Sequence, residues 1–196
     1  MIIGKSNSFN ESIFDTLLFA CRDIKHAKIP SYIKYISPYC FMGCKNLNSI
    51  EFENNSNLKT IGKLAFSDTS IQKIIIPANC SKIGESCFKS SNNLHSIEFN
   101  ENSEIDFIPN NSFELTNIKN IVIPRKIHLI ENDVFSGCEN LRSICFLGDK
   151  LIIHHHTLEQ IKTTTIIEFP NASNVHLSAK EIPNIVIMVK SGTLIR

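Results

Sequence analysis

One seven-residue segment occurs three times in this chain at a fixed interval. It reads NLNSIEF at Asn46 to Phe52, NLHSIEF at Asn93 to Phe99 and NLRSICF at Asn140 to Phe146, so equivalent residues lie 47 positions apart. A second series, which includes Ile74 and Ile121, falls midway and divides the unit into half-repeats of 23 to 24 residues. Periods of this size are typical of solenoids, in which each repeat buries its apolar face against its neighbours.

The spacing of the apolar residues indicates what one half-repeat forms. Leu47, Ile50 and Phe52 follow the L-x-x-L-x-L rhythm of a leucine-rich repeat. Ile50 and Phe52 alternate with Glu51, as in a strand that points its apolar side chains inward and its polar ones outward. We therefore expect stacked strands over one shared apolar ribbon. The phenylalanines that should line up in this ribbon are Phe41, Phe88 and Phe135, and in the second series Phe19, Phe66 and Phe113.

The repeat also suggests how the chain is organised. The regular pattern runs from about residue 14 to residue 149, and residues 150–196 keep it only in part. Short solenoids need protected ends. We therefore expect residues 1–196 to form a single solenoid domain in which 150–196 supply one or two degenerate rungs that close the stack.

Two long segments carry a resemblance to a known family. They are IPSYIKYISPYCFMGCKNLNSIEF at Ile29 to Phe52 and IPRKIHLIENDVFSGCENLRSICF at Ile123 to Phe146. Their joint spacing of Ile-Pro, Phe, Cys and Leu resembles the BspA-like leucine-rich repeats. The resemblance implies a right-handed β-solenoid with parallel stacked strands. It also implies a surface adhesin or antigen that binds host or matrix proteins.

Charge and cysteine content limit the partners and the compartment. The 20 basic and 19 acidic residues give a formal charge of +1, which disfavours nucleic acid and anionic membranes as partners. The apolar runs near the N-terminus are too short for a signal peptide or a transmembrane segment. Seven cysteines without a CxxC pair predict free thiols, as in a reducing compartment. Cell surface, by resemblance, and cytoplasm, by these features, both stay open.

Repeat positions predict the roles of individual cysteines. Three of them take positions that other coils fill with Ile or Val, so we expect buried thiols at Cys40, Cys80 and Cys87. Cys44 and Cys138 share a turn position and are expected to bond to backbone. Cys145 takes the outward position of Glu51 and is predicted to be the most reactive thiol.

A triple histidine raises the question of a metal site. Imidazole is a common zinc and copper ligand, but in an extended segment only His154 and His156, not His155, could share one ion. No cysteine or carboxylate stands at a companion spacing. A polar loop is therefore preferred, and neither a metal nor a cofactor is predicted.

The acidic residues Glu51, Glu98 and Glu168 fall on one predicted row, which resembles the paired acids of a glycosidase. Glu51 and Glu98 should lie two rungs apart, roughly 10 Å, at the upper limit for an inverting pair. The chain has no G-x-S-x-G, P-loop or H-E-x-x-H motif. We predict no enzyme activity, with a carbohydrate-active β-solenoid as the less favoured alternative.

The outward residues of the strands are the candidate binding site. The predicted row consists of Lys28, Glu51, Ile75, Glu98, Val122, Cys145 and Glu168, and beside it run His26, Ser49, Lys73, Ser96, Asn120 and Ser143. Alternating acidic and apolar residues suit a protein or peptide partner. The sequence thus favours a non-enzymatic protein-interaction module. An intracellular scaffold, and a solvated sheet face without a partner, are the alternatives.

Overall fold

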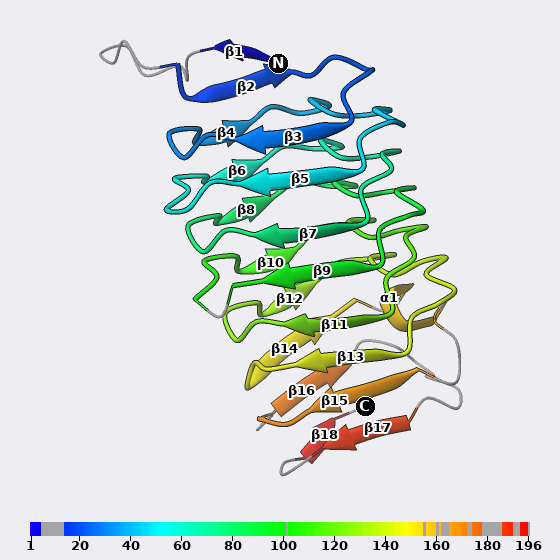
Figure 1. Cartoon of the computed structure of the whole chain (residues 1–196). Coiled ribbons are helices and arrows are strands. Elements are labelled where there is room, and N and C mark those ends of the chain that lie inside the picture. The colour runs from blue at the N-terminus through cyan, green and yellow to red at the C-terminus, as the bar shows by residue number, and fades with distance from the viewer. Residues whose placement is uncertain are drawn as a thin grey trace.

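The chain folds into a stack of coils with its N-terminal and C-terminal strands at opposite ends (Figure 1). The computed structural model describes residues 1–4, 14–100, 102–154, 156–159, 161, 165–171, 174–177, 186–189 and 193–195. Its strands pair in parallel from coil to coil, except at the N-terminus. The predicted parallel-stranded β-solenoid is therefore confirmed.

Each coil contributes one strand to the front of the stack, where the heptapeptide lies. These front strands are β3 (His26–Ile29), β5 (Ser49–Phe52), β7 (Lys73–Ile76), β9 (Ser96–Phe99), β11 (Asn120–Ile123), β13 (Ser143–Phe146), β15 (Ile166–Phe169) and β17 (Val186–Val189). Paired strands are in register, with Ile74 opposite Ile97 and Ile121 opposite Ile144. Along each strand, buried residues alternate with more exposed ones, as the apolar pattern predicts.

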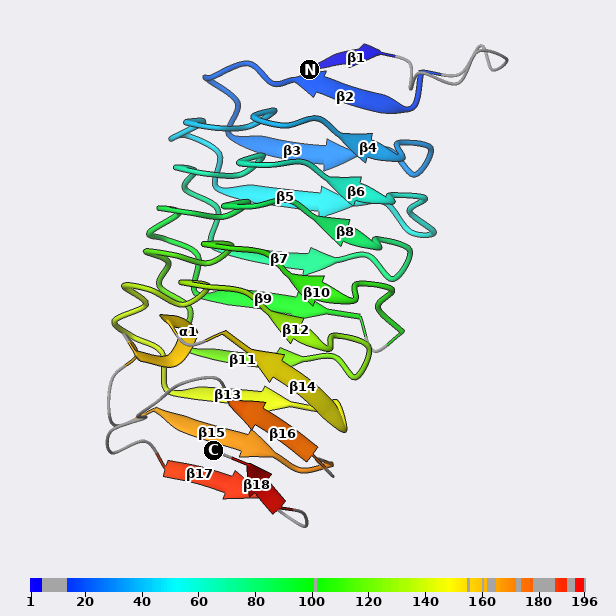
Figure 2. The same cartoon turned by 180° about the vertical axis from the view of Figure 1, so that it is seen from behind.

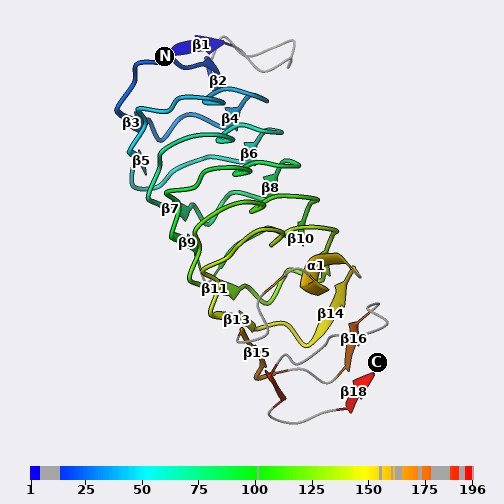
Figure 3. The ribbon, with the colours of Figure 1, turned by 90° about the vertical axis from the view of Figure 1, so that its right-hand side faces the viewer.

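A second series of shorter strands forms the back of the stack, seen in Figure 2. These are β2 (Thr16–Phe19), β4 (Tyr35–Ile36), β6 (Thr60–Ile61), β8 (Lys82–Ile83), β10 (Phe107–Ile108), β12 (Leu129–Ile130), β14 (Lys150–Ile153), β16 (Asn174–Leu177) and β18 (Thr193–Ile195). At the N-terminal end, β1 (Ile2–Gly4) pairs antiparallel with β2 and covers the edge of this series. The core lies between front and back strands, as the view along the side shows (Figure 3).

A tight turn joins each back strand to the next front strand, and these turns stack into a corner. Phe41 N–H donates to the Ala65 carbonyl of the next coil at 2.8 Å, and Phe66 N–H donates to Cys87 in the same way at 2.9 Å. The residues two positions before and after each phenylalanine donate likewise, always toward the C-terminal neighbour. The corner therefore satisfies its backbone groups between coils.

The corner phenylalanines form one continuous stack inside the core. Ring centroids lie 5.0 Å apart for Phe41 and Phe66, 5.6 Å for Phe66 and Phe88, 5.9 Å for Phe88 and Phe113, and 5.8 Å for Phe113 and Phe135. This confirms the predicted alignment and merges the two predicted series into one. Such offset ring pairs add to the stabilisation that burial provides.

Phe19 is the exception, and its predicted place in the core is wrong. It belongs to strand β2 and is 41% exposed, with the Arg22 guanidinium 5.4 Å from its ring centroid. Ala20, the next residue, is the buried one, and its N–H donates to the Cys40 carbonyl. The first coil has no coil before it to cover a phenyl ring, so a small residue takes the inward position.

The cysteines at aliphatic positions are buried, as predicted. Burial raises the pKa of Cys40 to about 12 and that of Cys80 to about 11. Cys44 and Cys138 lie in the turn column, where the Cys138 Sγ donates to the Phe113 carbonyl at 3.0 Å. The predicted bond between turn thiol and backbone is thus confirmed.

The C-terminal part extends both strand series rather than leaving them. β14 pairs with β12 and β16, and β15 pairs with β13 and β17. The short helix α1 (His156–Glu159) lies near the corner turns of the preceding coils (Figure 1). No helix in the described part of the chain is long and apolar enough to cross a membrane.

Candidate functional site

The structure places the seven predicted site residues on the outer side of the front strands. Register pairs set Lys28 beside Glu51, Ile75 beside Glu98, and Val122 beside Cys145, which in turn lies beside Glu168. The first five are exposed, including Ile75 at 52% and Val122 at 51%, whereas Cys145 and Glu168 are half-buried. A row of alternating acidic and apolar side chains is therefore present, and its role in binding stays a prediction.

The front strands do not form one continuous sheet. Hydrogen-bonded ladders join β3 to β5, β7 to β9, and β11 through β13 and β15 to β17, but β5 does not pair with β7, nor β9 with β11. Both breaks fall where the half-repeat has 24 residues, from Ile50 to Ile74 and from Ile97 to Ile121. The paired strands from β3 to β15 have the 23-residue spacing. One extra residue per coil thus accompanies each break.

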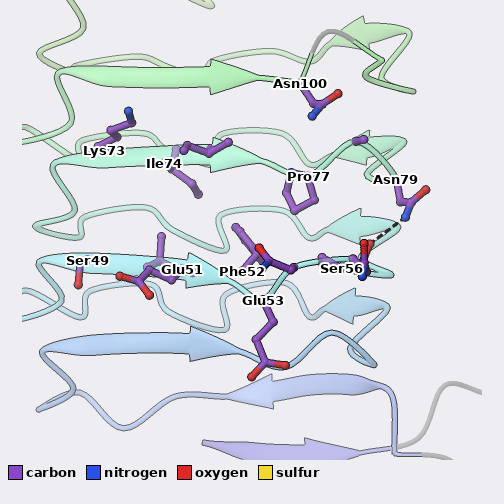
Figure 4. Close-up of a pocket in the computed structure, with 15 residues that line it drawn as sticks. Ser49, Glu51, Phe52, Glu53, Ser56, Lys73, Ile74, Pro77, Asn79 and Asn100 are labelled. Carbon is purple, nitrogen blue, oxygen red and sulfur yellow. Dashed lines mark hydrogen bonds between the residues drawn. The ribbon is translucent and has the colours of Figure 1, made fainter.

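A groove of about 790 Å³ lies over the first break, between β5 and β7. Phe52, Ile75 and Pro77 supply its apolar lining, with the carboxylates of Glu51 and Glu53 beside them (Figure 4). The remaining lining residues are Ser49, Ile50, Asn54, Asn55, Ser56, Lys73, Ile74, Ala78, Asn79 and Asn100. The floor is apolar and the rim carries amides and charges, a composition suited to a ligand with both kinds of group.

A second groove, of about 540 Å³, lies over the break between β9 and β11. Five of its lining residues are the 47-residue equivalents of residues in the first groove: Ser96, Glu98, Phe99, Asn120 and Val122 correspond to Ser49, Glu51, Phe52, Lys73 and Ile75. The front face therefore carries the same groove twice, two coils apart.

The breaks change the exposure of one repeat position. Phe52 and Phe99, at the ends of β5 and β9, are half-buried. Phe146 ends β13, which is paired on both sides, and is fully buried with its ring centroid 5.0 Å from that of Phe169. Sequence reasoning placed Phe52 inward with Ile50 and missed its open edge. The 24-residue spacing was the available signal.

Ion pairs across neighbouring coils set the charge of this face. Lys73 Nζ lies 2.6 Å from the Glu98 carboxylate, and Lys28 Nζ lies 3.8 Å from that of Glu53. Glu51 has no ion-pair partner among the described residues. The first groove thus offers one unpaired carboxylate beside its apolar floor.

Cys145 is not the open thiol that its outward position suggested. It is half-buried, and its pKa is raised by burial and by the adjacent Glu168 carboxylate, which disfavour the thiolate. Cys21 is the exposed cysteine. The prediction that Cys145 is the most reactive thiol is therefore wrong on both exposure and charge.

The histidine run is divided between two environments. His154 follows β14 and is half-buried, His156 opens helix α1, and His155 lies outside the described residues. The expectation of an extended polar loop is thus wrong for His156. Among the described residues, no group of His, Cys, Asp or Glu is arranged to hold a metal ion.

Comparison with known proteins gives one family match. A model described as "BspA type Leucine rich repeat region" matches residues 11–142 and 106–180, in six copies. A search of curated proteins finds no match.

Two solved structures are similar in fold. The pneumococcal vaccine antigen PcpA is 17% identical with a TM-score of 0.63, over 86% of this chain and 51% of that one. A leucine rich cell surface protein from Faecalibacterium prausnitzii A2-165 is 13% identical with a TM-score of 0.54, over 98% and 68%. This chain therefore spans about half the length of the pneumococcal antigen.

Proposed function

This chain belongs to the BspA-type leucine-rich repeat family, and from this we propose that it is a non-enzymatic module that binds a protein or peptide partner on its front face. The observation that carries the proposal is the alternation of exposed Ile75 and Val122 with Glu51 and Glu98 on neighbouring strands. The aliphatic side chains offer area to desolvate, and the carboxylates offer polar specificity. Repeat solenoids present such faces as extended binding surfaces.

A position at the cell surface, as an adhesin or antigen, is the preferred biological setting. The names of the two similar structures, a vaccine antigen and a cell surface protein, support it. The free, mostly buried thiols favour the alternative of an intracellular scaffold. Protease treatment of intact cells separates the two, because only a surface-exposed protein is removed while an internal marker survives.

An affinity pull-down with the whole chain tests the binding face. Glu98→Lys and Val122→Ala are expected to weaken capture of the partner at least tenfold, since each alters the centre of the row. Glu104→Lys is the matched control for charge, because Glu98 and Glu104 each make one exposed ion pair with a lysine of a neighbouring coil. Ile152→Ala, at 48% exposure on back strand β14, is the control for Val122. Equal losses in the controls would refute a front-face site.

A polysaccharide screen tests the enzymatic alternative. A carbohydrate-active solenoid would release reducing sugars, and Glu98→Gln would abolish the release because an acid is required. We expect no turnover by either protein. Turnover by the natural chain that disappears in Glu98→Gln would replace the proposed function.

A further inference from the structure

The two grooves share a spacing that restricts what can occupy both. Equivalent residues of the grooves, such as Ile75 and Val122, lie two coils apart. At a strand spacing of about 4.8 Å this separation is roughly 9.6 Å. A ligand that fits both grooves therefore presents the same apolar group about every 9 to 10 Å along the solenoid axis.

Resting on the proposed function, we propose that the two grooves bind an extended segment of the partner in the polyproline II conformation, running across the strands. Polyproline II has three residues per turn and rises about 3.1 Å per residue, so one face repeats about every 9.3 Å. That period matches the spacing of the grooves. A β-strand, with a repeat of about 6.8 Å on one face, does not.

The lining of the grooves fits this conformation. Polyproline II segments dock against exposed aromatic surfaces, and Phe52 and Phe99 are the front-strand phenylalanines that the ladder breaks leave half-buried. Pro77 and Ile75 extend the first apolar floor, and Val122 extends the second. Apolar side chains at every third position of the segment would enter successive grooves.

Charge identifies a second feature of the segment. Glu51 is exposed, lines the first groove and has no ion-pair partner among the described residues, whereas Glu98 in the second groove is engaged by Lys73 at 2.6 Å. A lysine or arginine beside the first apolar residue would pair with Glu51. The geometry points to a partner segment with an apolar residue every third position and a basic residue between.

Titration of the isotope-labelled protein with synthetic peptides, followed by amide NMR shifts, tests the inference. The probe is a peptide of repeated Pro-Arg-Leu triplets, about twelve residues long, which spans more than both grooves at about 3.1 Å per residue. We expect shifts in β7 and β11 together. A Pro-Arg-Gly-Leu peptide, whose repeat is about a third longer, should bind about tenfold more weakly because it cannot fill both grooves.

Variants locate the contact. Ile75→Ser and Val122→Ser should each weaken the triplet peptide about tenfold, while Ile152→Ser on the back face should leave it unchanged. Glu51→Gln should weaken the Arg peptide severalfold and have no effect on a Pro-Gln-Leu peptide, so that the double-mutant cycle shows coupling.

Three outcomes would overturn the inference. Equal binding of the three-residue and four-residue repeats would remove the basis in spacing. A linear oligosaccharide that shifts the same amides when the peptides do not would assign the grooves to glycan. Shifts that grow with protein concentration alone would assign them to a second copy of the chain. If no peptide binds but Val122→Ala still abolishes capture of the natural partner, the proposed function stands and this inference fails.

Discussion

At the scale of single residues, each repeat position sets a size and a polarity rather than one amino acid. The corner position beside the phenyl stack holds Cys44, Thr69, Ser91, Thr116 and Cys138, which are all small and buried. The hydroxyls of Ser91 and Thr116 donate to corner carbonyls at 2.7 Å, as the Cys138 thiol does at 3.0 Å. The position therefore selects a short donor, and sulfur and oxygen both serve.

Truncation inside and outside the coil should differ sharply. Phe88 is fully buried between Phe66 and Phe113, so Phe88→Ala is expected to lower the free energy of unfolding by about 3 to 5 kcal/mol. Glu98 is exposed, so Glu98→Ala should change it by no more than about 0.5 kcal/mol. Urea unfolding measures both, and similar values would contradict the assignment of inward and outward faces.

The buried thiols predict a loss of stability in alkali. Cys40 and Cys80 have pKa values raised from 9.0 to about 12 and about 11, so above pH 9 only the unfolded chain ionises them. Their stabilising contribution is complete below pH 9 and is lost as pH rises toward 11 to 12, with a slope of up to about 1.4 kcal/mol per pH unit for each thiol.

Urea unfolding between pH 8 and pH 10.5 checks this. Cys40→Val and Cys80→Ile are suitable variants, because Val134 and Ile33 occupy the same positions in other coils. The double variant should show a shallower decline with pH than the natural chain. An unchanged slope would mean that these thiols already ionise in the folded state.

At the scale of elements, the interval of 47 residues predicts which residues share a face but not how strands pair. Ile50, Ile74 and Ile97 were correctly aligned, and the row from Lys28 to Glu168 was correctly turned outward. The breaks were missed because an inward pattern is the same at 23 and 24 residues, whereas a hydrogen-bonded ladder depends on the exact backbone path. The β1–β2 hairpin and helix α1 lie where the repeat is absent or degenerate.

Amide hydrogen exchange should detect the breaks. β13 has ladder partners on both sides, β11 and β15, whereas β7 pairs only with β9. We expect the amides of β7 to exchange on average at least tenfold faster than those of β13, since fewer are held in ladders. Equal protection of β7 and β13 would indicate that the front sheet is continuous in solution.

At the scale of the whole molecule, strand pairing links a coil only to the coils next to it. The printed ladders join successive strands of the front series and of the back series, and no ladder skips a coil. Stability in such a protein is close to a sum over coils and their interfaces. The pair of coils that makes up the 47-residue unit should therefore be removable without loss of the fold.

Deletion of residues 74–120 removes one such unit of 47 residues and joins Lys73 to Ile121, which follows the equivalent position. We expect a shorter solenoid that still unfolds cooperatively and that retains one groove, built from β5 and β11. Deletion of residues 74–117 leaves three extra residues at the junction, which reverses the inward and outward faces of the strand. Circular dichroism and thermal unfolding should show the first variant folded and the second not; two folded variants would contradict the model of interchangeable units.

The stacked corner also gives the molecule electrical polarity along its length. Because Phe41, Phe66 and every other corner donor point their N–H groups toward the C-terminal neighbour, their peptide dipoles add instead of cancelling. The N-terminal end of the corner is accordingly the electronegative pole, and it is there that the guanidinium of Arg22 lies, 4.0 Å from Cys44 Sγ. The two ends of the protein thus present opposite partial charges to whatever approaches them.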